Sequence, residues 1–343
     1  MSLGRATIAD VAKLAGVSKA TVSRFLNHRD TLLTRDIAAR VETAVKALGY
    51  VPSPMAQALK RGRSKLIGLV VADITNPFSV AVLRGAEKAC KEAGYLVMLF
   101  NLGNDGTRER EAIEALASYQ VEGFILNTLG ADPMAASEVA RHGKPAVLID
   151  RKHDGVRADF VSLDNADAMR QGLNHLHDQG YRELLYVTEP VLGVSPRQER
   201  ASAFLAQTHA PASELRGQVI EVAEEDSVAL RQALQTLRQT AGRKGAAVVS
   251  GNAVTTLRVA AALAYLGWQA GTELGLVGID ETEWAPLVGP GLSTIAQPTD
   301  DIGRVAASCL LERLQGRDLP LRQILLPGRL IARASTQRVG KAP

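Results

Sequence analysis

Residues 7–27 read TIADVAKLAGVSKATVSRFLN, a stretch that predicts two short helices joined by a tight turn. Thr7 and Asp10 have the spacing of a capping box, in which a hydroxyl and an acidic side chain satisfy free amide groups at a helix start. Gly16 supplies the conformationally permissive turn position, and Ser18 stands where it can cap the second helix. The pattern is that of a helix-turn-helix.

The second helix of this stretch has one apolar side and one small, polar and basic side. We expect Val22, Phe25 and Leu26 to face inward. The outward side carries Lys19, Ala20, Thr21, Ser23 and Arg24. A helix with such an outward surface fits the major groove of DNA, which is about as wide as the helix.

A third helix follows, because Thr34 provides a cap, Gly49 a terminator, and apolar residues recur between them. Three helices can bury a minimal core, so residues 1–50 are predicted to form an all-α head.

Charge is distributed unevenly between this head and the rest of the chain. The chain has 40 Lys and Arg against 36 Asp and Glu, but residues 1–65 hold 12 basic and only 4 acidic residues, a net charge of +8. Residues 66–343 therefore carry a net charge of −4. A basic segment on a mildly acidic body is what phosphate neutralisation by the head predicts. A solvated basic domain without a nucleic-acid role is the alternative reading.

Residues 51–64 form a linker that contains the pattern of a very short helix. Ser53 can cap it, Pro54 fits its first position, and good helix formers continue to Lys60 before Gly62. So short a helix is marginal in water and needs partners to form. A DNA minor groove and the same helix of a second subunit are suitable partners, with Leu59 as an apolar wedge between base steps. A flexible linker is the alternative.

From Lys65 onward the chain alternates strand and helix patterns. Strand patterns lie at 66–72, 96–101, 123–128, 146–150, 184–188, 218–222, 246–250 and 274–279. Helical patterns lie at 77–93, 107–119, 134–142, 166–179, 197–207, 228–239, 254–266 and 302–314. The stretches 160–165, 292–298 and 326–329 are predicted as extended passages.

This repeated βαβ order predicts an α/β body of two doubly wound, mostly parallel-sheet subdomains. The first is expected at about 65–163 and 297–326, and the second at about 164–292 and 327–343. Two such units side by side place the carboxyl ends of both sets of strands on a common cleft, which is where a small ligand is expected.

Several other classes of protein lack support. The chain has no apolar stretch of 18 residues and no signal-peptide pattern, so we expect a cytoplasmic protein rather than an exported periplasmic sugar-binding protein. No G-x-G-x-x-G opens a helix after a strand and no nucleophile–base pair is suggested by spacing, which argues against a Rossmann-type oxidoreductase and predicts neither catalytic residues nor a cofactor. The six His lack zinc-type spacing, so no metal is expected, and Cys90 and Cys309 read as small buried hydrophobes.

Over essentially its whole length the chain resembles the LacI/GalR family of bacterial transcription regulators. The specific part is residues 7–27, and the short helix ending in Ala56-Gln-Ala-Leu59 resembles the family's hinge helix. The body resembles the family's periplasmic-binding-protein-like effector domain at Asn76-Pro-Phe78, Pro145-Ala-Val-Leu-Ile-Asp-Arg151, Asp164-Asn165, Arg200-Ala-Ser-Ala-Phe204, Gly275-Leu-Val-Gly-Ile-Asp280 and Leu292-Ser-Thr-Ile-Ala-Gln-Pro298.

The resemblance implies a homodimeric repressor that binds an approximately palindromic operator. It implies base reading by Lys19, Ala20 and Arg24. Phosphate contacts are expected from Thr7, Ser18, Thr21, Ser23 and Asn27. In the hinge it implies DNA contacts by Met55, Ala56 and Leu59, with Leu59 as the wedge.

The resemblance also implies a cleft that binds a small effector. The candidates for that cleft are Asn76, Phe78, Asp150, Arg151, Arg200, Asn252, Asp280 and Trp284. Asp280 and Asn252 can hold sugar hydroxyls, and Trp284 can lie against a sugar's apolar face. Arg151 and Arg200 can instead hold a carboxylate.

One departure from the family pattern bears on the effector. Ala253 stands where many relatives have Asp, so a cleft carboxylate is missing beside two arginines. This favours an anionic effector, a sugar acid of the gluconate type with 2-ketogluconate as the leading candidate. A neutral sugar or a nucleobase is the alternative. We expect the effector to act by induction, through loss of the hinge helix, with corepression as the opposite possibility.

Overall fold

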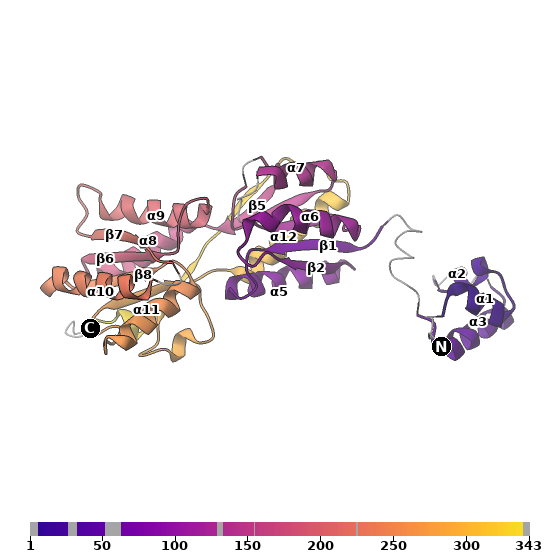
Figure 1. Cartoon of the computed structure of the whole chain (residues 1–343), viewed down its shortest axis with the longest axis horizontal. Coiled ribbons are helices and arrows are strands. Elements are labelled where there is room, and N and C mark those ends of the chain that lie inside the picture. Colours follow the sequence, from indigo (N-terminus) through magenta and orange to yellow (C-terminus); the bar gives the residue numbers. More distant parts are fainter. Residues whose placement is uncertain are drawn as a thin grey trace. The chain divides into compact units, whose positions relative to one another are not determined.

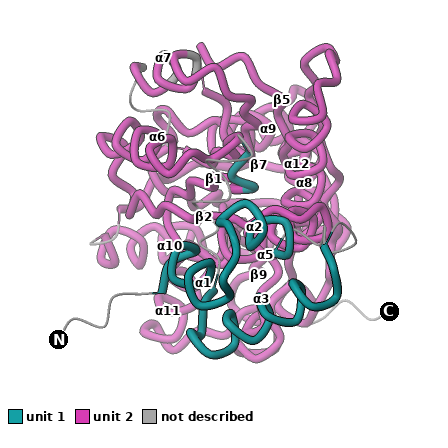
Figure 2. Tube along the Cα trace, turned by 90° about the vertical axis from the view of Figure 1, so that its right-hand side faces the viewer, with its two compact units in different colours: residues 1–65 teal, residues 66–343 magenta. Residues whose placement is uncertain are grey.

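The computed structural model describes residues 6–26, 33–51, 63–128, 133–153, 155–223 and 226–338. The chain divides into two compact units, residues 1–65 and residues 66–343, which Figure 2 shows in different colours.

The described residues of the first unit form a head of three helices (Figure 1). Its helices are α1 (Ile8–Ala15), α2 (Lys19–Leu26) and α3 (Arg35–Leu48). The predicted capping box is confirmed, because the Thr7 amide donates to Asp10 Oδ2 at 2.9 Å and the Asp10 amide donates to Thr7 Oγ1 at 3.4 Å. Gly16 ends α1 with a φ of 65°, the left-handed conformation that favours glycine.

The start of α2 and the core of the head also follow the prediction. The Thr21 amide donates to Ser18 Oγ at 3.1 Å, which caps α2. Val11, Val22 and Val41, one from each helix, are fully buried and pack together. A single shared core therefore holds the three helices in one arrangement.

The second unit contains two six-stranded sheets with the same strand order. The first is β11-β5-β4-β3-β1-β2, made of Gln323–Leu326, Asp159–Leu163, Ala146–Ile149, Gly123–Asn127, Leu66–Val71 and Leu96–Asn101. The second is β12-β10-β9-β8-β6-β7, made of Arg329–Ile331, Ser293–Ala296, Gly275–Ile279, Ala246–Ser250, Glu183–Thr188 and Arg216–Glu221. All neighbouring strands run parallel except β12, which runs antiparallel to β10. The predicted pair of doubly wound subdomains is confirmed.

Helices cover both faces of each sheet (Figure 1). On the first sheet, α5 (Pro77–Glu92) and α12 (Thr299–Leu314) share one core, and α6 (Glu109–Ser118) and α7 (Pro133–Arg141) share the other. On the second, the pairs are α8 (Asn165–Asp178) with α9 (Ser195–Thr208), and α10 (Ser227–Ala241) with α11 (Ala253–Tyr265). Among the described residues, short 3₁₀ turns lie at Gly106–Arg108, Gly242–Lys244, Ala285–Leu287 and Ala334–Thr336.

Helices α5 and α12 approach each other closely through two glycines. A Cβ built at Gly85 would collide with the backbone carbonyl of Asp300, and one built at Gly303 would collide with that of Val82. The contact therefore depends on backbone meeting backbone, which only glycine permits.

The structure corrects the prediction for the three extended passages. Residues 160–165 and 292–298 contribute β5 and β10, each an interior strand of a sheet, and residues 326–329 join β11 of one sheet to β12 of the other. The polar residues Asp159 and Ser293 begin these strands yet are buried, so the usual apolar signal of an interior strand is interrupted. The chain consequently crosses between the subdomains three times, after β5, β10 and β11.

Cys90 and Cys309 are both free and buried, as predicted, and burial raises the pKa of the Cys90 thiol to about 11. Within the described ranges, no helix combines the length and the apolar character needed to cross a membrane.

Candidate nucleic-acid interface and effector cavity

The outward face of α2 presents the predicted base-reading side chains. Lys19, Ala20 and Arg24 are all exposed. Ser23 and Thr21 are half-buried, and the Thr21 hydroxyl lies 3.0 Å from Ser18 Oγ within the cap. The structure therefore presents one exposed row along α2 and places the hydroxyl groups at its edges.

Thr7 is exposed, but its hydrogen-bonding groups are already in use. Its hydroxyl and its amide both donate to Asp10 Oδ2, at 2.7 and 2.9 Å. These hydrogen bonds from Thr7 lower the pKa of Asp10. Asn27, Met55, Ala56 and Leu59 lie outside the described residues.

An arginine that the sequence reading did not single out fixes the turn of the head. Arg40 on α3 donates from Nε and Nη2 to the Ala15 carbonyl, at 3.1 and 2.6 Å, and from Nη2 to the Gly16 carbonyl at 3.1 Å. It thereby satisfies carbonyls that the end of α1 leaves free. The angle between α1 and α2 is set in part from the third helix.

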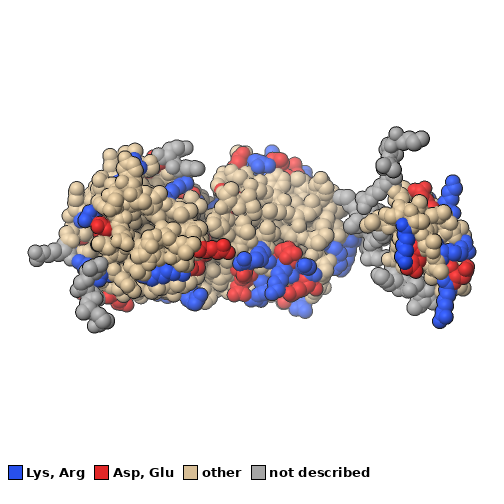
Figure 3. Space-filling view, turned by 90° about the horizontal axis from the view of Figure 1, so that it is seen from below, with Lys and Arg blue, Asp and Glu red and all other residues tan. Residues whose placement is uncertain are grey.

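The body differs from the head in its surface charge. On the face shown in Figure 3, Lys and Arg side chains of the body are interleaved with Asp and Glu. This mixed surface matches the net charge of −4 that residues 66–343 carry. The net positive charge is confined to residues 1–65, which also carry a few acidic side chains.

A polar cavity of about 190 Å³ lies in the body at the carboxyl ends of strands from both sheets. Seven of the eight predicted effector residues line it: Asn76, Phe78, Asp150, Arg151, Arg200, Asn252 and Asp280. They come from both subdomains, as the strand-end rule for such folds predicts.

Trp284 is the predicted residue that the structure places elsewhere. It precedes the 3₁₀ turn Ala285–Leu287 and packs against the core beneath α10 and α11. Ala285 is fully buried and its carbonyl accepts from the Leu292 amide at 2.8 Å, which holds this loop against the core. The indole is therefore engaged in packing and does not line the cavity.

Two aspartates occupy matching positions in the two sheets. Asp150 follows β4 and Asp280 follows β9, with φ values of 60° and 84°. The Asp150 amide donates to the Val161 carbonyl at 2.9 Å, and the Asp280 amide donates to the Ile295 carbonyl at 3.0 Å. Each aspartate thus turns the chain off its sheet in the same strained way and aims a carboxylate at the cavity.

Asp280 is the more buried of the two carboxylates. It accepts from the Ala253 amide at 2.9 Å and from Gln297 Nε2 at 2.6 Å. Burial raises its pKa, while nearby Arg200 and these hydrogen bonds act in the opposite direction.

Two of the cavity's arginines already donate hydrogen bonds to protein acceptors. Arg200 donates from Nε to Asn165 Oδ1 and from Nη1 to the Gly251 carbonyl, both at 2.7 Å. Arg197 donates to Glu189 Oε2 at 2.7 Å and to the Pro190 carbonyl at 2.9 Å.

Arg151 differs from both of these arginines. Its side chain is buried, yet Nε and Nη1 have no hydrogen-bond partner in the part of the chain that the structure describes. The carboxylate of Asp150 lies 3.9 Å from Nε, too far for a hydrogen bond. Burial lowers the pKa of this guanidinium, although such a group stays cationic at any ordinary pH. The cavity wall therefore holds a buried cation with unused donors.

Sequence reasoning missed Glu189 and Arg197, which also line the cavity. Asn252 Nδ2 donates to Glu189 Oε2 at 2.7 Å. A carboxylate therefore does lie beside Asn252, supplied by the end of β6 rather than by position 253, and the inference of a missing acid is wrong in that respect. Glu189 directly follows a buried strand, so its place after Thr188 was a signal that could have found it. The other polar lining residues that were not predicted are Asp73, Thr75, Ser79, Asn104, Asn127, Arg258 and Gln297.

Comparisons with known proteins agree with this arrangement. Residues 7–53 match the family described as bacterial regulatory proteins, lacI family, and residues 173–336 match a periplasmic binding protein-like domain. The chain is 48% identical to the HTH-type transcriptional regulator PtxS of Pseudomonas plecoglossicida, over 97% of this chain and 96% of that protein. It is 38% identical to the HTH-type transcriptional regulator KdgR of Bacillus subtilis, over 97% and 98% of the two chains.

Among solved structures, the lac repressor dimer bound to operator and an anti-inducer has the same fold. The TM-score is 0.79 at 24% identity, over 96% of this chain and 99% of that chain. With a head that matches the family's DNA-binding segment and relatives this similar over their whole length, the chain belongs to the lacI family of bacterial regulatory proteins.

Proposed function

We propose that the protein is a transcriptional repressor that binds a palindromic operator as a dimer and is released by a sugar acid, with 2-ketogluconate as the leading candidate. The reading head is residues 1–50, the hinge 51–64 and the effector domain 65–343. The protein is a binding protein rather than an enzyme, and it acts in the cytoplasm, where the bacterial chromosome lies.

The observation that carries the effector class is the unsatisfied guanidinium of Arg151. A buried cation with unused hydrogen-bond donors costs free energy that an anionic ligand recovers on binding. A carboxylate matches the planar arrangement of guanidinium donors. Since Arg197 and Arg200 already serve protein acceptors, the acid group of the effector belongs at Arg151.

The rest of the cavity suits the polyhydroxy part of a sugar acid. Asn252, Glu189 and Asp280 offer amide and carboxylate groups that can bind hydroxyls. Asn76 and Phe78 lie on the opposite subdomain, so a ligand that touches both sets spans the two sheets.

On the DNA side, we assign base reading to Lys19, Ala20 and Arg24, because these are the exposed side chains of α2. Lys and Arg can pair with guanine acceptors, and an Ala methyl can contact the thymine methyl. Phosphate contacts are assigned to Ser18, Thr21, Ser23 and Asn27, and to Thr7, whose hydroxyl must turn from Asp10 to donate to a phosphate. The hinge contacts are assigned to Met55, Ala56 and Leu59.

Repression and release are linked through the body. A ligand shifts an equilibrium only by its difference in affinity between two states. An effector that holds the two subdomains in the arrangement unfavourable to the hinge helices lowers operator affinity, and by reciprocity operator DNA lowers effector affinity by the same factor.

Calorimetry on the full-length protein tests the effector class. Titration with 2-ketogluconate, gluconate and glucose should show binding of one or both acids and not of the neutral hexose. Arg151→Met should weaken binding of the acid about 10- to 100-fold, because it removes charge-assisted hydrogen bonds. Lys152→Met removes a neighbouring cation that bonds Glu199 and does not line the cavity, so it should leave affinity unchanged. Binding of glucose alone would refute the acid effector.

A gel-shift experiment on the same protein tests the DNA role. A palindromic fragment from the promoter of this gene should be bound, and the acid that binds in calorimetry should release it. Tighter binding in the presence of the acid would show corepression instead. Leu59→Ala should weaken operator binding and leave the affinity for the acid nearly unchanged. Normal operator binding by that variant would remove the wedge assignment.

A further inference from the structure

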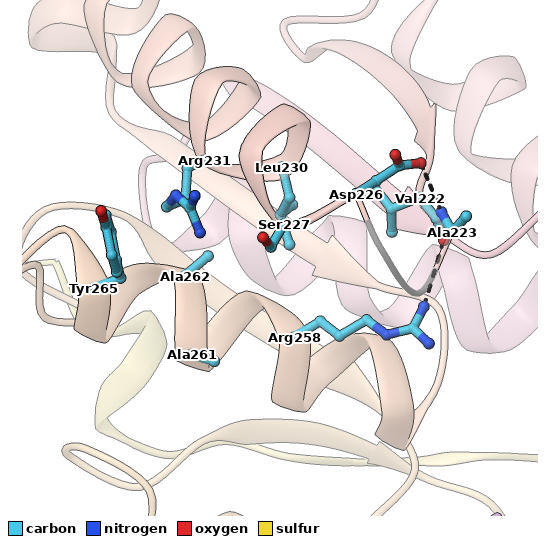
Figure 4. A pocket seen from close by; sticks show the side chains of 10 residues that line it. All are labelled: Val222, Ala223, Asp226, Ser227, Leu230, Arg231, Arg258, Ala261, Ala262 and Tyr265. Atoms are coloured by element: carbon cyan, nitrogen blue, oxygen red, sulfur yellow. Dashed lines mark hydrogen bonds between the residues drawn. The ribbon is translucent and has the colours of Figure 1, made fainter.

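A second cavity of about 280 Å³ lies on the second subdomain, between α10 and α11 (Figure 4). Its floor and walls are mostly apolar: Val222, Leu230, Ala261 and Ala262, with the ring of Tyr265 at one end. This volume exceeds that of an engineered apolar cavity of about 150 Å³ that takes up benzene. The cavity therefore has room for one aromatic ring with a small substituent.

Two arginines border this apolar space at different ends (Figure 4). Arg231 lies beside the ring of Tyr265, with 4.2 Å between its Cζ and the ring centroid, and Arg258 reaches across toward Val222 (Figure 4). Arg258 Nη1 donates to the Val222 carbonyl at a long 3.4 Å. Neither arginine forms an ion pair with any other residue in the described ranges. Asp226, the acidic side chain on the rim, accepts from the Ala223 amide at 3.1 Å.

We propose that this cavity is a second ligand site, for a small aromatic carboxylate, and that it is coupled to the effector cavity. The ring occupies the space between Leu230 and Ala262, where it gains hydrophobic burial and an edge contact with Tyr265. The carboxylate meets the guanidinium group of Arg231, whose charge offers a charge-assisted hydrogen bond at the Tyr265 end of the cavity.

The coupling rests on helix α11, which lines both cavities. Arg258 belongs to the walls of both of them. At its N-terminus the same helix is fixed by the effector cavity, because Asn252 caps it through the Thr255 amide at 2.9 Å and Asp280 accepts from the Ala253 amide at 2.9 Å. An anion bound in the second cavity attracts the Arg258 guanidinium, which lines the same space, and so draws its positive charge away from the first cavity. Affinity for an anionic effector then falls, and by reciprocity the effector weakens the second ligand equally.

Calorimetry of the full-length protein with benzoate and its neutral analogue benzamide tests the site. Benzoate should bind with an affinity at least tenfold above that of benzamide. Arg231→Met should reduce benzoate affinity about tenfold or more, since the charge-assisted bond is lost. Arg238→Met is the matched control, because Arg238 is on the same helix and stacks on Trp268 at 4.6 Å, outside the cavity, so benzoate binding should be unchanged. Ala261→Phe fills the cavity from an exposed position and should abolish binding.

Three results would overturn the site: no benzoate binding at concentrations up to about 10 mM, equal affinities for benzoate and benzamide, or wild-type benzoate affinity in both Arg231→Met and Ala261→Phe. The coupling is tested separately by repeating the benzoate titration with the effector cavity saturated by the sugar acid. A fall in benzoate affinity of about threefold or more, abolished in Arg258→Met, supports the coupling. An unchanged affinity would refute it and leave the site itself standing. The benzoate arms need no sugar acid, so their outcome is independent of the effector's identity.

Discussion

Single side chains decide how firmly the head is held together. Arg40 satisfies the carbonyls of Ala15 and Gly16, and a Cβ at Gly16 would lie 2.7 Å from Arg40 Nη2. The turn residue and the arginine are therefore matched to each other, although 24 residues separate them in the chain. A sequence analysis limited to the two helices of the helix-turn-helix cannot predict this contact, because Arg40 lies on the third helix.

Arg40→Ala should destabilise the head by about 1–2 kcal/mol, because two carbonyls lose a charged donor. A head that unfolds more readily binds operator more weakly, which gel shift at rising temperature measures. The control is Arg35→Ala, an exposed residue on the same helix. If Arg40→Ala binds operator as well as Arg35→Ala at every temperature, the contact does not fix the turn.

In the body, Asp159 governs how stability depends on pH. The carboxylate is fully buried and receives Arg313 Nε and Nη2, both at 2.8 Å, and Arg322 Nη2 at 3.0 Å. Burial raises the pKa of Asp159, but the hydrogen bonds from the two arginines outweigh burial and hold the pKa well below its ordinary value. A depressed folded-state pKa gives stability that is present above the unfolded-state value of about 4 and is lost as pH falls below it.

Urea unfolding of the body should therefore show a lower midpoint at about pH 3 than at pH 7. Asp159→Asn should cost about 3–5 kcal/mol at pH 7, because it leaves two arginines without their buried counter-ion. It should also flatten the dependence of the midpoint on pH. A variant with an unaltered pH dependence would show that other carboxylates cause the acid sensitivity.

At the scale of elements, the packing of α12 on α5 depends on two backbones in contact. The glycines at 85 and 303 let the two helices meet. Helix α12 reaches α5 only because the chain returns to the first subdomain after β10. A larger side chain at this contact separates the helices along their whole length, and with them the core that they share.

Gly85→Ala should destabilise the protein by about 1–3 kcal/mol, since its methyl group collides with the Asp300 carbonyl. Gly172→Ala is the matched control in α8, where the nearest atom to an added Cβ lies 3.9 Å away. That change should be neutral or stabilise by up to about 1 kcal/mol, because alanine favours a helix. Thermal unfolding of both variants measures the difference, and equal melting temperatures would contradict the close contact.

At the scale of the whole molecule, DNA binding and effector binding depend on charge in different ways. The head carries the positive charge that meets phosphates, while the effector cavity is lined by charged groups of both signs, of which Arg151, Arg200 and Asp280 are buried. Surface charge is screened by salt and buried charge much less.

Operator affinity should fall by about 10³-fold or more between about 50 and 200 mM salt, as expected for a protein with several phosphate contacts. Affinity for the sugar acid should change less than about tenfold over the same range. Fluorescence anisotropy with labelled operator and calorimetry with the acid measure the two slopes. Equal slopes would mean that the acid binds at an exposed site rather than in the cavity.

How much of this could be predicted from the sequence depends on whether the signal is local. Caps at Thr7, Ser18 and Thr34 are local patterns, and the structure confirms them. The rule that ligands bind at the carboxyl ends of parallel strands predicted a shared cavity, and seven of the eight proposed residues line it. The prediction that Trp284 lines the cavity was wrong, because its orientation depends on a loop that the core holds in place. No local sequence pattern encodes that contact.

The contacts that sequence reasoning missed join residues far apart in the chain. Arg40 with the turn at Gly16 and Glu189 with Asn252 are pairs of this kind. The strands β5 and β10 were missed for another reason, because each begins with a buried polar residue that breaks the apolar pattern.

The three crossings of the chain have a consequence for its synthesis. The first sheet lacks β11, and its helix α5 lacks α12, until residues 299–326 have left the ribosome. Contacts between segments this far apart in sequence form slowly, and the nascent first half meanwhile exposes apolar surface. Neither half of the body can therefore complete its fold until nearly the whole chain has been synthesised. We expect the protein to depend on chaperones that cover the apolar face of α5 until α12 packs against it.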